Sequence, residues 1–180
     1  MTEILPHARV ERVNNRCREF GRKNVCLVSI HTNAAGNGHQ WMSGRGWCCY
    51  TSRGQTAGDR LADCLYQQAS IWLPGQKIRK DYADGDPDLE SDFYILRHTL
   101  CAAALSENLF HDNEQDLAFL ESAQGREAIV QIHVKGIIQY LLRDSPFPTA
   151  SHVIPGLTGN LRRSIIPSLP SVPSIDGSFF

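Results

Sequence analysis

The sequence has no long apolar segment and no excess of charge of either sign. No run of residues approaches the roughly 18 to 20 apolar residues that a membrane-spanning helix needs. The formal net charge is −1, so the chain lacks the global basic field that holds nucleic acid or anionic lipid. Hydrophobic residues make up 42% and charged residues 21% of the chain, which is typical of a globular protein. A length of 180 residues gives room for one domain and a tail.

Several common catalytic and structural motifs are also absent. The six cysteines are Cys17, Cys26, Cys48, Cys49, Cys64 and Cys101. They form no CxxC pair, which argues against a zinc knuckle or a thioredoxin-like motif. Their apolar surroundings favour reduced, buried thiols over disulfides and a non-secretory protein. Ser29 and Ser106 lie in no GxSxG elbow, so a serine hydrolase is not indicated. The first residues also lack the basic segment and apolar core of a signal peptide.

Helix-like and strand-like segments alternate along most of the chain. The run VCLVSI, residues 25–30, is apolar and rich in β-branched residues. It predicts a strand that is buried on both faces and ends at His31. Other predicted elements are helices over residues 8–20, 56–72 and 124–142, strands over 47–51 and 93–96, and a small apolar segment over 101–105. This alternation predicts a layered α/β domain.

The composition changes after residue 143. The segment 144–180 holds six of the nine prolines and many serines. Proline interrupts helices and central strands. We therefore expect one domain over residues 1–143 and a disordered or loosely attached tail over 144–180.

Two residues are the main candidates for chemistry. His31 closes the predicted strand and opens a loop rich in glycine and asparagine, and Glu107 follows the small apolar segment in the same way. In open α/β sheets, ligands bind just beyond the carboxyl ends of strands. Together the two residues suggest metal-assisted hydrolysis, in which a glutamate handles protons. A capping histidine and a solvated glutamate are the structural alternatives.

Weaker candidates are better explained as ordinary structure. They are the alternating acids Asp84, Asp86, Asp88 and Glu90, the helical His133, and the loop residues His39 and Trp41. The acidic segment lacks the spacing of an EF-hand, so we expect a solvated loop. We expect His133 to be a structural histidine, and His39 and Trp41 to lie in a surface loop rather than to line a groove.

Several motifs in a consistent order resemble one known family. VSIHTNAAG, residues 28–36, resembles the SIHANA strand-end motif of zinc-dependent N-acetylmuramoyl-L-alanine amidases. The later segments DRLADCLY, IRKD, DGDPDLE, FYILRHT and AAALSENLFHDN look like a subgroup common in Bacteroidetes and their phages. The resemblance runs from about Arg9 to Leu142. It implies a phosphorylase/hydrolase-like fold, a twisted mixed sheet flanked by helices.

The resemblance also implies a site. In the family, two histidines and a glutamate hold one zinc ion, and a water occupies the open fourth position. His31 matches the later histidine ligand, and Glu107 matches the glutamate that acts as general base. The family's first histidine lies in a GHGG-like turn on the first strand, and its glutamate ligand lies on the first helix. This sequence contains no GHGG-like turn, and His7 is not a substitute.

These departures define what we expect of the chain. It resembles an N-terminally truncated amidase that lacks the first strand and helix and two of three zinc ligands. An unpaired sheet edge would carry a risk of aggregation. The expected activity is cleavage of the bond between N-acetylmuramic acid and L-alanine, with peptidoglycan as partner and with no nucleic acid. The alternatives are a non-catalytic peptidoglycan-binding remnant and a fragment of a longer reading frame. Family members act at the cell wall, but the sequence does not reveal a compartment.

Overall fold

A mixed sheet of four strands forms the centre of the protein. The computed structural model describes residues 4–142. The strand order is β1 (Cys26–Asn33), β4 (Ala102–Phe110), β2 (Cys48–Thr51) and β3 (Leu89–Glu90). β4 is parallel to β1 and antiparallel to β2, and β2 is parallel to β3. This arrangement confirms the predicted α/β fold with a mixed sheet.

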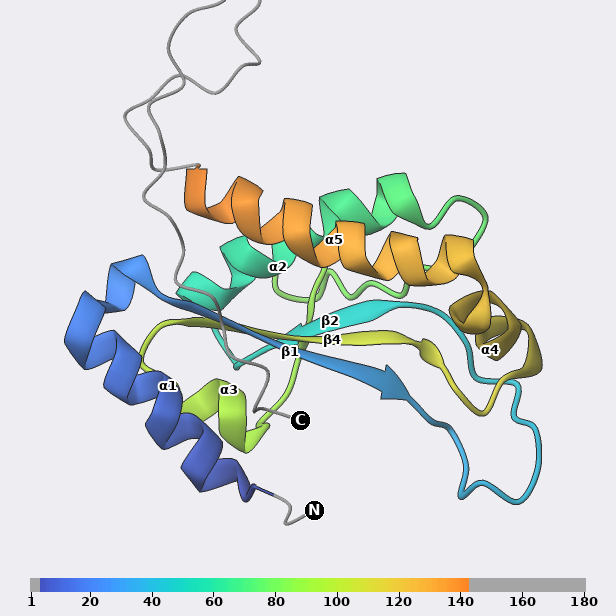
Figure 1. Cartoon of the computed structure of the whole chain (residues 1–180), viewed down its shortest axis with the longest axis horizontal. Helices are drawn as coiled ribbons and strands as arrows, with labels where there is room; N and C mark the ends of the chain where they lie inside the picture. The colour runs from blue at the N-terminus through green and yellow to red at the C-terminus, as the bar shows by residue number, and fades with distance from the viewer. Residues whose placement is uncertain (1–3, 143–180) are drawn as a thin grey trace, which may run out of the picture. The chain divides into compact units, whose positions relative to one another are not determined.

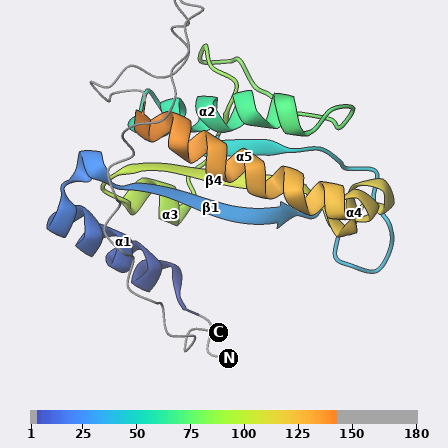
Figure 2. The same ribbon diagram turned by 45° about the horizontal axis from the view of Figure 1, so that its top comes forward.

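Helices cover both faces of the sheet (Figure 1). α2 (Ala57–Trp72) and α5 (Ala123–Leu142) lie over one face, and α1 (Pro6–Phe20) and α3 (Tyr94–His98) lie on the other, as both views show (Figure 2). α4 (Glu114–Glu121) follows β4 and leads directly into α5. Among the described helices, none is both long and apolar enough to cross a membrane.

The two faces of β4 contribute to two separate hydrophobic clusters. Ala102 and Ala104 pack into the larger cluster, together with residues of α2 and α5. Ala103 and Leu105 pack into a smaller cluster with Leu96 of α3. This alternation follows from the period of two residues along a strand. It places β4, and therefore Glu107, at the centre of the domain.

The helix boundaries have local causes that the sequence reveals. Thr56 caps α2 with a capping box, because its Oγ1 accepts a hydrogen bond from the Gly58 backbone and its own N–H donates to Asp59. α1 ends where Gly21 adopts φ +86°, a conformation that glycine adopts without strain. The predicted helices over 8–20, 56–72 and 124–142 are confirmed.

The sequence-based prediction for residues 93–96 is wrong. They belong largely to α3 rather than to a strand, because a short apolar run does not distinguish a strand from a buried helix. α4 was not predicted at all. The prediction that β1 is buried on both faces is also wrong, because Ile30 is 56% exposed. Within residues 4–142, β1 lies at one edge of the sheet and pairs only with β4. β1 also continues past His31 to Asn33.

The prediction of reduced, buried cysteines is confirmed for four of the six, since Cys26 and Cys101 are only partly buried. All six are free thiols, and Cys17, Cys48, Cys49 and Cys64 are buried. Residues 143–180 lie outside the described part, so the predicted tail stays a prediction.

Candidate functional site

His31 and Glu107 lie side by side in the sheet. They are register partners on the parallel strands β1 and β4, and partners in register point to the same face of a sheet. On the other side of Glu107, Cys48 of β2 is its antiparallel partner. The structure thus brings the two main candidates together. Glu107 lies inside β4 rather than after its end, because that strand continues to Phe110.

The carboxyl group of Glu107 is half-buried and incompletely paired. Its Oε2 is shielded from solvent and has no hydrogen-bond partner among the described residues. Burial raises the pKa of Glu107, and the nearby charges of Arg79 and His111 act in the opposite direction. A glutamate with a raised pKa can exchange a proton closer to neutral pH than an exposed one.

The ring of His31 is exposed and positioned by its own strand. Its Nε2 lies 2.8 Å from Oγ of Ser29, two residues earlier on the same face. Its backbone carbonyl accepts a hydrogen bond of 2.9 Å from Nδ2 of Asn108. The imidazole therefore lies at the surface, next to a carboxyl group that is partly withdrawn from water.

A buried network behind the two residues fixes their strands. Nε1 of Trp47 donates a hydrogen bond of 2.8 Å to Oδ1 of Asn108, and Asn108 in turn bonds the His31 backbone. The next residue, Leu109, is fully buried at φ +64°, which is strained for a branched side chain. Sequence reasoning missed Trp47 and Asn108, although Asn108 directly follows Glu107.

The long loop after β1 is anchored to the segment that follows β4. Oδ2 of Asp112 accepts hydrogen bonds of 2.7 Å from the backbones of Ala35 and Gly36. Nδ2 of Asn113 donates to the carbonyl of Met42 at 2.8 Å. His39 and Trp41, between these anchors, are exposed, as expected for a surface loop.

The described residues do not form a complete zinc site. A catalytic zinc ion usually has three protein ligands and a water. Within residues 4–142, no group of three or more His, Cys, Asp or Glu residues is arranged to hold a metal ion. His31 and the unpaired Oε2 of Glu107 have the right donor chemistry, but they are too few.

The weaker candidates have mixed outcomes. His133 is buried between Oγ of Ser106, at 2.8 Å, and the carbonyl of Ile129, at 2.6 Å. It is thus a structural histidine, as predicted, and its burial lowers its pKa. The prediction of a solvated loop is wrong for Asp88, because this residue is 2% exposed and accepts a hydrogen bond from Thr51.

Asp88 predicts a pH dependence of stability. Burial, and then hydrogen bonding to Asp86, raises the pKa of Asp88 to about 8. The folded chain therefore keeps a proton on Asp88 that the unfolded chain loses near pH 4. The contribution of Asp88 to the free energy of unfolding is present at low pH and is lost as the pH rises through about 8. We expect Asp88→Asn to gain ~1–2 kcal/mol over the wild type between pH 5 and pH 9, as measured by urea unfolding. Asp84→Asn, in the exposed part of the loop, is the control and should follow the wild type. Parallel pH profiles for Asp88→Asn and the wild type would contradict the assignment.

Comparison with known sequences identifies one family. The sequence profile of the N-acetylmuramoyl-L-alanine amidase family matches residues 6–139. An endolysin of Bacillus phage SPP1 is 30% identical over 134 residues, which are 73% of this chain and 45% of the endolysin. The chain thus spans about half the length of this curated relative. The predicted Bacteroidetes and phage subgroup stays a prediction.

Solved structures share the fold. An N-acetylmuramoyl-L-alanine amidase from Clostridium difficile 630 matches with a TM-score of 0.63 and 24% identity, over 81% of this chain and 69% of that chain. The catalytic domain of CwlV, from Bacillus (Paenibacillus) polymyxa var. colistinus, matches with a TM-score of 0.61 and 23% identity, over 78% of this chain and 67% of that chain.

Proposed function

The chain belongs to the N-acetylmuramoyl-L-alanine amidase family, and we propose that it hydrolyses the amide between N-acetylmuramic acid and the L-alanine of the peptidoglycan stem peptide. One observation carries this proposal beyond family membership. Glu107 holds a half-buried carboxyl group with an unpaired oxygen, in register beside the exposed His31. A proton-transferring carboxylate next to a potential metal ligand is what metal-assisted hydrolysis requires.

Glu107 would carry the proton through the reaction. Its carboxylate accepts a proton from water as the water oxygen attacks the amide carbonyl carbon. The same proton then passes to the amide nitrogen as the carbon–nitrogen bond breaks. The products are a glycan with a lactyl carboxylate and a stem peptide with a free L-alanine amine. The raised pKa of Glu107 suits both steps, because the group must gain and lose the proton in each turnover.

His31 is our candidate for one zinc ligand. The family is generally zinc-dependent, and an exposed imidazole on β1, in register with Glu107, can bind a metal. Residues 4–142 contain no group of three potential ligands, so the described residues supply only part of such a site.

This shortage of ligands favours one alternative function. A chain that keeps the fold and the loops around β1 and β4, but holds no metal, would bind peptidoglycan without cutting it. Its partner would be the same polymer, and only the chemistry would differ.

One assay separates these functions. The purified chain is incubated with bacterial peptidoglycan and zinc, with and without a chelator, and released stem peptides with free L-alanine amino termini are counted. We expect release that the chelator stops. Cosedimentation with peptidoglycan without release, from a chain shown to be folded by circular dichroism, would support the binding function instead. If a folded chain neither released stem peptides nor cosedimented with peptidoglycan, both proposed functions would be wrong.

A further inference from the structure

A cavity lies at the opposite end of the sheet from His31 and Glu107. Its volume is about 980 Å³, and its lining includes residues 22–24, just before β1, and residues 101–103, at the start of β4. The parallel strands run from this end towards His31 and Glu107. The five residue steps from Ala102 to Glu107 span roughly 16 Å, so the cavity is separate from the candidate site.

The charged residues of the lining are all cationic. Arg22, Lys23, Arg60 and Arg97 line the cavity, and no aspartate or glutamate does. The side chains of Arg22, Lys23 and Arg97 form no hydrogen bond or ion pair with any other residue of the described part. Because the whole chain carries a formal net charge of −1, this cluster is a local feature. Unpaired like charges repel one another, and an anion between them would relieve that repulsion.

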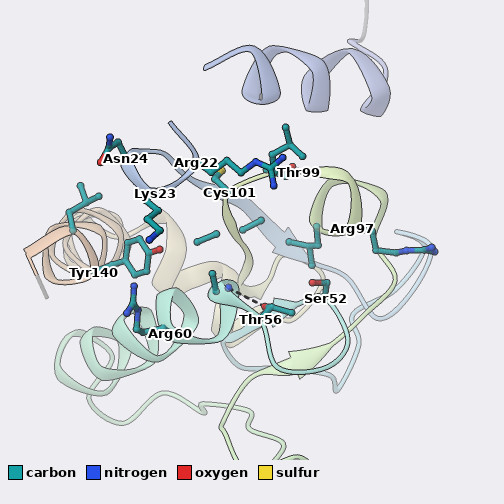
Figure 3. A pocket seen from close by; sticks show the side chains of 17 residues that line it. Arg22, Lys23, Asn24, Ser52, Thr56, Arg60, Arg97, Thr99, Cys101 and Tyr140 are labelled. Carbon is teal, nitrogen blue, oxygen red and sulfur yellow. Dashed lines mark hydrogen bonds between the residues drawn. The ribbon is translucent and has the colours of Figure 1, made fainter. Parts of the chain in front are cut away.

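Two of the cations approach one aromatic ring. Figure 3 shows Lys23 and Arg60 approaching Tyr140 from different elements, with Arg22 beside Thr99 and with Arg97 pointing away at the rim. The guanidinium of Arg60 lies over the Tyr140 ring, 5.3 Å from its centroid. Such stacking holds the guanidinium of Arg60 in place beside the cavity.

Neutral groups of the cavity suit an anion as well. The first turn of α2 lines it at Thr56 and Gly58, and the start of a helix carries partial positive charge. The Ser52 hydroxyl also lines the cavity and has no hydrogen-bond partner among the described residues. The carboxylate of this turn, Asp59, is outside the lining and is engaged by the Thr56 backbone and hydroxyl.

From these contacts we infer that the cavity binds a ligand with clustered phosphate groups. A guanidinium group can bind two phosphate oxygens at once, and a lysine adds a point charge. A soluble polyphosphate or phosphodiester polymer and an anionic lipid headgroup share this chemistry. Binding here would hold the domain on a phosphate-rich surface while the opposite end of the sheet stays accessible. The inference does not depend on amide hydrolysis.

Calorimetric titration of the full chain with tripolyphosphate at low ionic strength tests this site. We expect saturable binding that weakens as salt is added, since salt screens the charges. The double variant Lys23→Gln/Arg60→Gln should weaken binding at least tenfold. The control Arg12→Gln/Lys77→Gln removes the same charges from exposed positions outside the cavity and should bind like the wild type. Lys23→Arg keeps the charge and should retain binding, which separates lost charge from a general disturbance of the fold.

Sedimentation with vesicles distinguishes the two sources of phosphate. Binding to phosphatidylglycerol vesicles, but not to phosphatidylcholine vesicles, with competition by tripolyphosphate, would identify a lipid headgroup. Binding of tripolyphosphate alone would identify a soluble phosphate ligand. Equal binding by both double variants, or no binding of either probe by the wild type, would overturn the inference.

Discussion

Replacing Glu107 by glutamine is expected to lower the release of stem peptides from peptidoglycan by at least about 100-fold, the usual contribution of a positioned general acid–base group. Glutamine has nearly the same shape, but it neither accepts a proton from water nor gives one to the leaving amine. The half-buried setting of Glu107 should tolerate the neutral amide, because burial already disfavours the charged carboxylate. The loss should therefore appear in the rate and not in folding.

The control for this variant is Glu11→Gln, which changes an exposed glutamate on α1. It should leave the release of stem peptides unchanged. Both variants should have the circular dichroism spectrum and the thermal midpoint of the wild type. If Glu107→Gln released stem peptides at the rate of Glu11→Gln, another group would have to transfer the proton, and the role assigned to Glu107 would be wrong.

The pairing of His31 with Glu107 illustrates what the sequence could reveal. Each residue follows a short apolar run, and in an α/β sheet such runs become neighbouring strands. That logic correctly predicts that they lie close together. It misplaces Glu107 by a few residues, because a polar residue within a strand looks the same in sequence as one that follows it.

The surroundings of the pair depend on contacts that no local pattern encodes. Arg79 and His111 lower the pKa of Glu107, against the effect of burial. Trp47 donates a hydrogen bond to Asn108, which lies 61 residues away in the sequence. The basic cavity likewise joins residues from 22 to 141 of the chain. Periodicity and motif spacing describe neighbours along the chain, whereas these contacts arise only when the sheet orders its strands as β1, β4, β2 and β3.

The interior of the site region depends on one fully buried carboxylate, Asp116. Its Oδ2 accepts hydrogen bonds from the backbones of Gly46, at 2.7 Å, and Phe110, at 3.1 Å. Its Oδ1 lies 3.3 Å from Nε of Arg45. Gly46 ends the long loop after β1, and Phe110 ends the strand that carries Glu107. Asp116 therefore ties the loop to the end of the strand.

Removing this carboxylate leaves several buried groups unpaired. Asp116→Ala should lower the free energy of unfolding by about 3–5 kcal/mol, because the buried N–H groups of Gly46 and Phe110 lose their acceptor and the partly buried Arg45 loses its counter-charge. Domains of this kind have only about 5–15 kcal/mol in total, so the variant should be close to unfolding at room temperature. Urea titrations followed by circular dichroism measure the change.

Asp92→Ala is the matched control, because it removes an aspartate from an exposed ion pair with Arg53 at the same 3.3 Å separation. Exposed pairs contribute only about 0–1 kcal/mol. Asp116→Asn should fall between the two, since its amide oxygen can still accept hydrogen bonds from the backbone while the charge opposite Arg45 is lost. Equal losses for Asp116→Ala and Asp92→Ala would show that burial does not set the strength of this contact. The anchoring of the loop would then have to rest on Asp112 and Asn113 alone.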